Sequence, residues 1–261
     1  MMPRSPYIVF LILLIFFVIS FITNIIGPLM PDIIESFNLS LTLVALIPFA
    51  FFIAYGVMSI PAGMLLLKFK EQHLIVSAFI VIFFGAILFA LFPSYLTALF
   101  SFFIIGCGMA VLQVVINPLL RVTGGEEHFA MYAVFAQLVF GFASFISPLV
   151  YTQLASETFF LADYPFLQNL STFLIPKELP WISLYFLFSV ISLFMILILA
   201  FSKFPKVELK SNEKSGALAT HIKLFKNKQI QLFFLGMVCY VGAEQGIANW
   251  ISQFLNVYHG I

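Results

Sequence analysis

The sequence predicts an all-α integral membrane protein, and three observations lead to that fold class. Of its 261 residues, 62% are hydrophobic and only 9% are charged, whereas about a quarter of the residues in soluble domains are charged. The mean hydropathy is +1.12. Seven apolar runs also approach or exceed the roughly 20 residues that a helix needs to cross a bilayer. They cover approximately 7–31, 41–67, 74–92, 95–119, 130–153, 181–202 and 229–256.

The charges of the connections predict how these runs are oriented. With the N-terminus in the cytoplasm, eleven of the twelve basic residues fall on the cytoplasmic side, and only Lys177 falls outside. An excess of Lys and Arg marks cytoplasmic loops. The apolar run after Arg4 is too long for a signal peptide, so we expect an uncleaved first span. We therefore expect a multi-pass protein of the plasma membrane (the bacterial inner membrane), surrounded by the lipid bilayer, with a cytoplasmic N-terminus.

The first three runs differ in their polar residues. The first carries Ser20, Asn24, Gly27 and Pro31 on one helix face, at spacings of four, three and four. The second has a seam of small residues, and the third is almost entirely apolar. Because Asn24 precedes Pro28 and Pro31, its amide either binds a solute or satisfies carbonyls that the prolines leave free.

The fourth run carries Gly106, Ala110, Gln113 and Asn117 on one face, again at spacings of four, three and four. Small residues let another helix approach closely, and amides in a membrane helix need a polar partner. Two roles stay open for the amides: hydrogen bonds between helices, or the lining of a water-filled solute path. We expect this helix to stop near Asn117-Pro118, because proline lacks an N–H and crowds the preceding turn. A polar loop, RVTGGEEH, follows.

The fifth run carries small residues and Gln137 along one face, with hydrogen bonding between helices as the favoured role of Gln137, and the sixth is apolar apart from serines. The six runs thus show a weak repeat of three helices, polar, small and apolar. Since three is odd, the second copy is inverted, as in each six-helix half of the major facilitator transporters. We expect an N-terminal six-helix bundle at 1–202, with its third and sixth helices against lipid, and a cytoplasmic linker at 203–228. The region 229–261 then supplies the seventh helix, the start of an incomplete C-terminal half.

The seventh run carries Glu244, the one acidic residue well inside any run. An ionisable side chain within a membrane is costly and indicates a functional site by default; a neutral, hydrogen-bonded structural role is the alternative. Tyr240 lies one turn before Glu244, within hydrogen-bonding reach along the helix. Gln245 and Asn249 form a second pair of amides, four residues apart, on a neighbouring face.

Four sequence segments resemble the fucose permease branch of the major facilitator superfamily, whose members carry fucose, glucose and related sugars. They are FITNIIGPLMPDI at 21–33, AYGVMSIPAGMLLLKF at 54–69, LQVVINPLLRVTGGEEHF at 112–129 and YVGAEQGI at 240–247. The resemblance covers most of the chain apart from the connections 154–180 and 203–228. It implies that Gln113 and Asn117 line the central cavity and contact sugar hydroxyls.

The sequence departs from that branch at two acidic positions. Fucose permeases carry a Glu where this chain has Gln113, and an Asp where it has Ile25, and the resemblance ties both acids to proton coupling. The superfamily's loop between helices 2 and 3 also carries an Asp-Arg pair, whereas here Leu67 replaces the Asp before Lys68. These departures leave Glu244 as the coupling candidate.

The leading hypothesis is a secondary active transporter of a small polar solute, with a sugar as the favoured class, that works by alternating access with a proton or sodium ion as co-substrate. The residues expected to bind the solute are Asn24, Gln113, Asn117, Tyr240, Glu244, Gln245 and Asn249. An exporter of amphipathic compounds is the alternative. A seven-helix receptor or photosensor is less favoured, because the seventh run has no Lys for a retinal Schiff base. We expect no enzyme activity, cofactor, metal or nucleic-acid partner, since no catalytic or metal-ligand spacing occurs.

Overall fold

A computed structural model describes residues 5–155, 176, 178–204 and 226–259 of the chain. Within this part, seven helical segments are long and apolar enough to span a membrane, which confirms the predicted count and the all-α class. The first segment consists of α1 and α2, separated by a turn at Ile25. The bounds are α1 Pro6–Asn24, α2 Ile26–Phe37, α3 Leu41–Leu66, α4 Glu71–Leu91, α5 Tyr95–Gly124, α6 Phe129–Ala155, α8 Ser183–Phe201 and α10 Lys228–His259.

The predicted end of the fourth helix is wrong. Helix α5 continues through Pro118 to Gly124, and only Gly125 and a short 3-10 turn, Glu126–His128, separate it from α6. A membrane helix tolerates an internal proline because neighbouring side chains and helices satisfy the freed backbone groups. Gly125, at φ 83, provides the chain reversal instead. The first span is also longer than predicted, because α2 extends it to Phe37.

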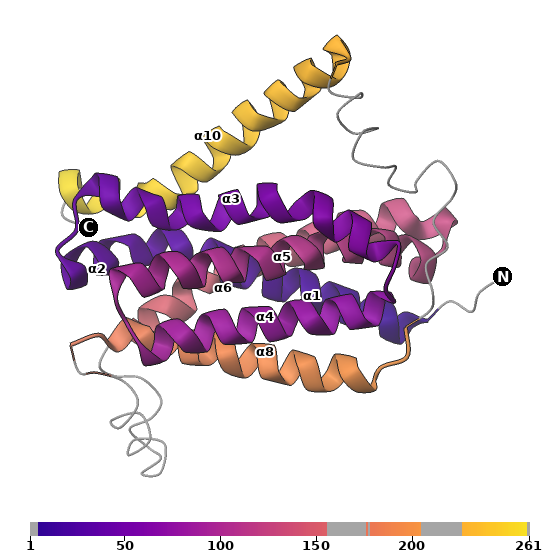
Figure 1. Cartoon of the computed structure of the whole chain (residues 1–261), viewed down its shortest axis with the longest axis horizontal. Coiled ribbons are helices and arrows are strands. Elements are labelled where there is room, and N and C mark those ends of the chain that lie inside the picture. The colour runs from indigo at the N-terminus through magenta and orange to yellow at the C-terminus, as the bar shows by residue number, and fades with distance from the viewer. Residues whose placement is uncertain (1–4, 156–175, 177, 205–225, 260–261) are drawn as a thin grey trace.

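Helix α5 lies at the centre of the bundle. It packs against α3 on one side and α4 on the other, and it also contacts α1 (Figure 1). Helix α8 packs on the far side of α4, and α6 packs on α1. Helix α4, the third span, therefore lies between α5 and α8, and the expectation that the third and sixth helices face lipid stays a prediction.

A cluster of aromatic side chains, two of them on α8, joins α8 to α4 and α5. Tyr185, which is 1% exposed, lies edge-on to Phe89 with ring centroids 4.6 Å apart and to Phe188 at 5.5 Å. Phe102 of α5 lies 6.0 Å from Tyr185. The sixth span, apolar in sequence, thus buries one face in the core while the other exposes large apolar side chains such as Phe194 and Leu197.

Close helix contacts occur at glycines of α4 and α5. A Cβ atom added to Gly106 would collide with the carbonyl oxygen of Phe51 in α3 and lie 2.9 Å from the Cβ of Ala54. A Cβ on Gly108 would lie 2.6 Å from the Cγ1 of Ile82 in α4. The expectation that Gly106 admits a neighbouring helix is therefore confirmed, and that helix is α3.

Hydrogen bonds tie the ends of α8 to other helices. At one end, the Tyr7 hydroxyl of α1 lies 3.0 Å from the Ser202 Oγ, and the Gln72 Nε2 of α4 donates to the carbonyls of Leu199 and Ala200. At the other end, the Trp181 indole donates to the Ser36 Oγ of α2 over 3.0 Å. The two bonds from Gln72 satisfy carbonyl groups that α8 leaves unpaired at its C-terminus.

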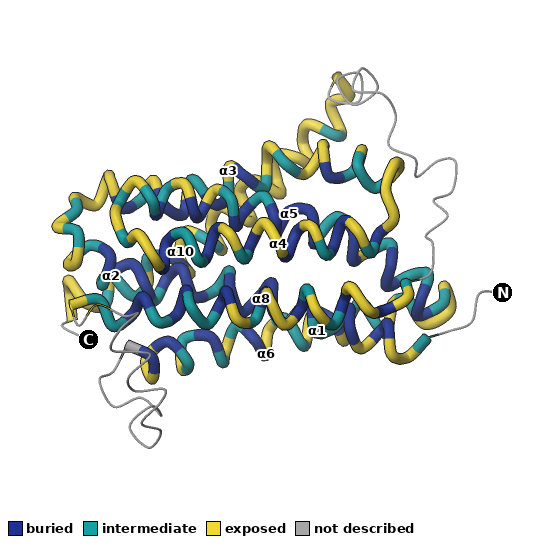
Figure 2. The backbone as a smooth tube through the Cα atoms, turned by 60° about the horizontal axis from the view of Figure 1, so that its bottom comes forward, coloured by how far each residue is buried: buried dark blue, intermediate teal, exposed yellow. Residues whose placement is uncertain are grey.

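The remaining helices are much less covered. The buried share of the most apolar stretch is 28% in α3, 17% in α6 and 0% in α10, compared with 61% in α5. Figure 2 shows the long exposed stretches of α3 and α10. Helix α10 contacts the bundle at α2, near its C-terminal half, and its N-terminal half diverges from the other helices (Figure 1). Most of the expected linker at 203–228 lies outside the described residues, as does most of the connection 154–180.

Candidate functional site

The amides of α5 lie on the side of the helix that α3, α4 and α1 leave uncovered. Gln113 is half-buried and Asn117 is exposed, whereas the neighbouring Leu112 and Ile116 are fully buried. The Asn117 Nδ2 donates to the main-chain carbonyl of Gln113 over 3.1 Å. This bond lies within the helix, so Asn117 does not join helices within the described part of the chain.

Asn24, the last residue of α1, makes a similar bond to its own helix. Its Nδ2 donates to the Ser20 carbonyl over 2.9 Å and to the Ser20 Oγ over 3.1 Å. The carbonyl that Pro28 leaves free is that of Asn24 itself, four residues earlier. The Asn24 side chain therefore does not satisfy a carbonyl freed by Pro28, which was the alternative to solute binding.

Helix α10 repeats the arrangement. The Asn249 Nδ2 donates to the Gln245 carbonyl over 2.8 Å. Asn249 is the only buried residue of α10, because α10 meets α2 at this point: a Cβ on Gly27 would collide with the Ala248 carbonyl and lie 3.1 Å from the Asn249 Cα. Asn249 thus lies at a helix contact in this structure, while Gln245 beside it is half-buried.

The three bonds share a chemical consequence. An asparagine amide has two N–H donors and one carbonyl acceptor. Where Nδ2 is held by the carbonyl four residues earlier, Oδ1 is directed away from that carbonyl. Asn24, Asn117 and Asn249 therefore each offer a fixed hydrogen-bond acceptor, on three different spans.

Tyr240 and Glu244 lie one turn apart on α10 and are both exposed. Tyr240 is 63% exposed, and no hydrogen bond between the two side chains is found in the described part of the chain. The helix that carries them packs mainly on α2. Their assignment to a solute site remains a prediction.

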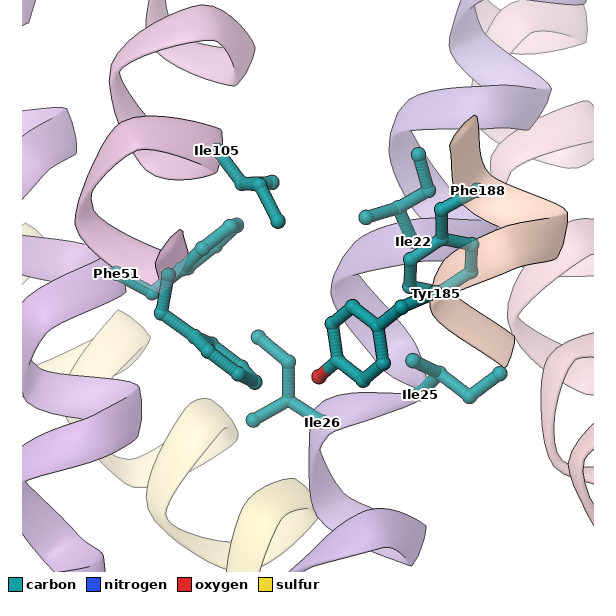
Figure 3. A pocket seen from close by; sticks show the side chains of 8 residues that line it. Ile22, Ile25, Ile26, Phe51, Ile105, Tyr185 and Phe188 are labelled. Atoms are coloured by element: carbon teal, nitrogen blue, oxygen red, sulfur yellow. The ribbon is translucent and has the colours of Figure 1, made fainter. Parts of the chain in front are cut away.

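Ile25 lies in the apolar interior. It is 1% exposed and lines a cavity of about 10 Å³ together with residues of α1, α2, α3, α5 and α8. Figure 3 shows the Tyr185 hydroxyl pointing into this space, towards Ile26. A cavity of that size holds at most about one water molecule, so it is not a solute site. A carboxylate at position 25 would be surrounded by apolar side chains and this single phenol.

The exposed first turns of α10 border an open surface groove that is lined by Gln229, Leu232, Phe233, Gly236 and Met237. It is apolar apart from Gln229 and contains none of the predicted solute-binding residues. In the residues that the structure describes, no group of three or more His, Cys, Asp and Glu is arranged to hold a metal ion.

One polar link was not foreseen from the sequence. The Ser20 Oγ donates to the Phe140 carbonyl of α6 over 2.6 Å, which connects Asn24 through Ser20 to another helix. The sequence does place Ser20 and Asn24 on one face, but it does not show that α6 packs there. Gln137, expected to bond between helices, is exposed on α6 instead.

Comparisons with known proteins agree with this architecture. The sequence profile of the Major Facilitator Superfamily matches residues 12–261. A glucose/galactose transporter of Brucella abortus biovar 1 (strain 9-941) is 28% identical over 250 residues, which cover 93% of this chain and 57% of that protein. The L-fucose-proton symporter of Escherichia coli (strain K12) is 26% identical over 265 residues, covering 96% and 60%.

A solved structure shows the same fold. The transporter FucP, in the outward conformation, superposes with a TM-score of 0.67 and 24% sequence identity, over 93% of this chain and 61% of that one. The chain thus spans somewhat more than half the length of the relatives that it matches.

Proposed function

The chain belongs to the major facilitator superfamily, and from that premise we propose that it forms part of a secondary transporter for a small neutral sugar. Two of its relatives carry the names of sugar transporters. In this superfamily the solute binds near the middle of the membrane between two six-helix halves, and alternating access results from rocking of the halves around it. The described helices provide one half and the first helix of the other.

The observation that carries the proposal is the set of fixed amide acceptors on α1 and α5. A sugar hydroxyl both donates and accepts a hydrogen bond, so it pairs with a carboxamide in either direction. Asn24 and Asn117 each present Oδ1 after their Nδ2 groups are held by the main chain, and the side chain of Gln113 is not used in the Asn117 bond. Uncharged amides suit a neutral, hydroxyl-rich solute better than an anion or a cation.

The test is uptake of radiolabelled D-glucose, D-galactose and L-fucose into cells that express the native-length protein, with cells carrying an empty vector as control. We expect saturable uptake of at least one sugar, and competition among sugars with the same hydroxyl pattern. Absence of uptake of all three, combined with reduced accumulation of a lipophilic dye, would favour the alternative of an exporter of amphipathic compounds.

We further propose that Glu244 couples uptake to a proton. It is the acidic residue that lies deepest within the seventh span, with fifteen residues of α10 between it and Lys228 and fourteen between it and His259. Both acidic positions of the fucose permease pattern are neutral here, at Ile25 and Gln113. A sodium ion is the alternative co-substrate, for which Glu244 would serve as a ligand.

A protonophore and a sodium-free medium separate these alternatives. Collapse of the proton gradient should abolish accumulation of the sugar against its gradient, whereas removal of sodium should leave it unchanged. Glu244→Gln should then still equilibrate the sugar across the membrane but no longer concentrate it. Concentrative uptake by Glu244→Gln with the native pH profile would remove Glu244 from coupling.

The orientation proposed from the basic residues places the N-terminus in the cytoplasm of a plasma-membrane protein. Single cysteines at Lys68 and at Asn38, which lie in connections at opposite ends of the bundle, test it directly. A membrane-impermeant maleimide should label the second in intact cells and the first only after permeabilisation.

A further inference from the structure

We infer that Ser20 is a positioning residue for the solute, because it sets the direction in which the Asn24 amide points and ties that amide to α6. This assignment rests on the proposed function and adds a residue to it. Ser20 is fully buried, at 0% exposure, so it does not meet the solute itself. Its hydroxyl lies between two partners that belong to different helices.

The hydrogen-bond directions follow from elementary valence. A serine hydroxyl has one proton to donate and can accept two bonds. The Phe140 main-chain carbonyl can only accept, so the short 2.6 Å bond uses the Ser20 proton. The 3.1 Å bond between Ser20 and Asn24 must therefore have Asn24 as the donor.

Both oxygen atoms that Asn24 meets on Ser20 are acceptors, the Oγ and the main-chain carbonyl. An amide turned by 180° would place Oδ1 against two acceptors, which is repulsive. The orientation of Asn24 is thereby determined, with Nδ2 towards Ser20 and Oδ1 away from it. The Asn24 Oδ1 then accepts a hydrogen bond that a hydroxyl group of the solute donates.

Through Ser20, the position of the Asn24 side chain also depends on helix α6. Helix α6 packs on α1, and the Phe140 carbonyl is the atom that holds the Ser20 proton. Asn24 is also the last residue of α1, directly before the turn at Ile25. No further turn of α1 follows it to pack against its side chain. Of the three asparagines with a bond to the carbonyl four residues earlier, Asn24 is the one whose partner residue also bonds to another helix.

The variant that tests the assignment is Ser20→Ala in the native-length protein. Its matched control is Ser192→Ala on α8, an equally buried serine whose hydroxyl has no hydrogen-bond partner among the described residues. The readout is the concentration dependence of D-glucose, D-galactose and L-fucose uptake. Since the main-chain carbonyl of Ser20 still holds Nδ2, we expect a partial effect: KM rises about three- to tenfold, Vmax stays within about twofold, and Ser192→Ala behaves as the native protein.

Two further variants exclude a merely structural role. Ser20→Thr keeps the hydroxyl and should restore a KM close to the native value. In the Asn24→Ala background, Ser20→Ala should raise KM no further, because the two residues act through one contact. An unchanged KM in Ser20→Ala, an equal defect in Ser20→Thr, or an undiminished effect of Ser20→Ala without Asn24 would each overturn the assignment.

The same data separate this inference from the proposed function. If the native protein takes up none of the three sugars, the proposed function fails and the assignment of Ser20 fails with it. If uptake occurs and Asn24→Ala raises KM while Ser20→Ala does not, the proposed function stands and only the role of Ser20 is rejected.

Discussion

Glycines of the bundle differ in how closely other helices approach them. Those of α4 and α5 are closely packed, and most of those in α3, α6 and α10 are open. A Cβ atom on Gly85, Gly106 or Gly108 would lie closer than 3 Å to an atom of a neighbouring helix. A Cβ atom on Gly56, Gly63, Gly141 or any of the three glycines of α10 would meet no atom of another helix within 4 Å in the described part of the chain. The same residue type thus allows close packing in one region and meets open space in the other.

In the described part of the chain, the glycines of α3, α6 and α10 are therefore left uncovered by any other helix. Glycine within a helix is destabilising by about 0.5–1 kcal/mol relative to alanine, and in membrane helices it is enriched where another helix approaches closely. Gly242 and Gly246 of α10 have the G-x-x-x-G spacing of such contacts. The relatives that the chain matches extend well beyond the matched part.

The largest expected effect tests the packed region at Tyr185, the largest of the fully buried side chains in the described part of the chain. Tyr185→Ala should destabilise the protein by about 3–5 kcal/mol, because it leaves a cavity among Phe89, Phe102 and Phe188. Phe194→Ala on the same helix removes a similar volume from an exposed position and should have little effect. Thermal unfolding in detergent compares the two, and equal losses would contradict the distinction between the faces of α8.

A smaller effect is expected where α3 meets α5. Gly106→Ala places a methyl group against the backbone of Phe51, which cannot move aside as a flexible side chain would. Overpacking of this kind is destabilising by about 1–3 kcal/mol. The melting temperature of the purified protein should fall, and a variant as stable as the native protein would show that α3 and α5 can separate at this point without loss.

The amides on the uncovered side of α5 should affect binding rather than stability. Gln113→Ala and Asn117→Ala should each weaken sugar binding in the native-length protein by about 1–3 kcal/mol, because a solute hydroxyl is left unpaired. The unfolding temperature should change little, since the recorded Asn117 bond lies within its own helix. Unchanged affinity in both variants would assign the amides a structural role.

The smallest effect is expected at the open glycines. Gly141→Ala in the 261-residue chain should leave stability unchanged or raise it by up to about 1 kcal/mol. Loss of stability in the 261-residue chain would show that α6 already has a close neighbour, contrary to the comparison above.

The number, type and approximate bounds of the helices could be predicted, because a membrane imposes a length and a composition on each span. The failure at Pro118 has a physical cause. The rule that proline ends a helix comes from the loss of one hydrogen bond and a clash, and within a membrane the alternative of an open backbone is worse. Gly125, with its positive φ, was the actual end signal.

The site was predicted less completely, because sequence spacing reports one helix at a time. The spacing of Ser20 and Asn24, and of Gln113 and Asn117, correctly placed each pair on one helix face, one turn apart. It carried no information on which helix lies opposite, so the bond from Ser20 to Phe140 and the burial of Asn249 against Gly27 could not be anticipated. Those depend on how seven helices pack together.

The contact between Gly27 and the Ala248–Asn249 backbone also has a mechanical consequence. About twenty residues of α10 lie between this contact and the start of the helix at Lys228. They correspond to a helix length of about 30 Å at 1.5 Å per residue. A rotation of α10 by about 10° about Gly27 would move the start of the helix by about 5 Å. Because Gly27 lets the two backbones meet, the axis of such a rotation would lie at this contact. A spin label near Lys228 would therefore report a displacement that a label near Asn249 would not.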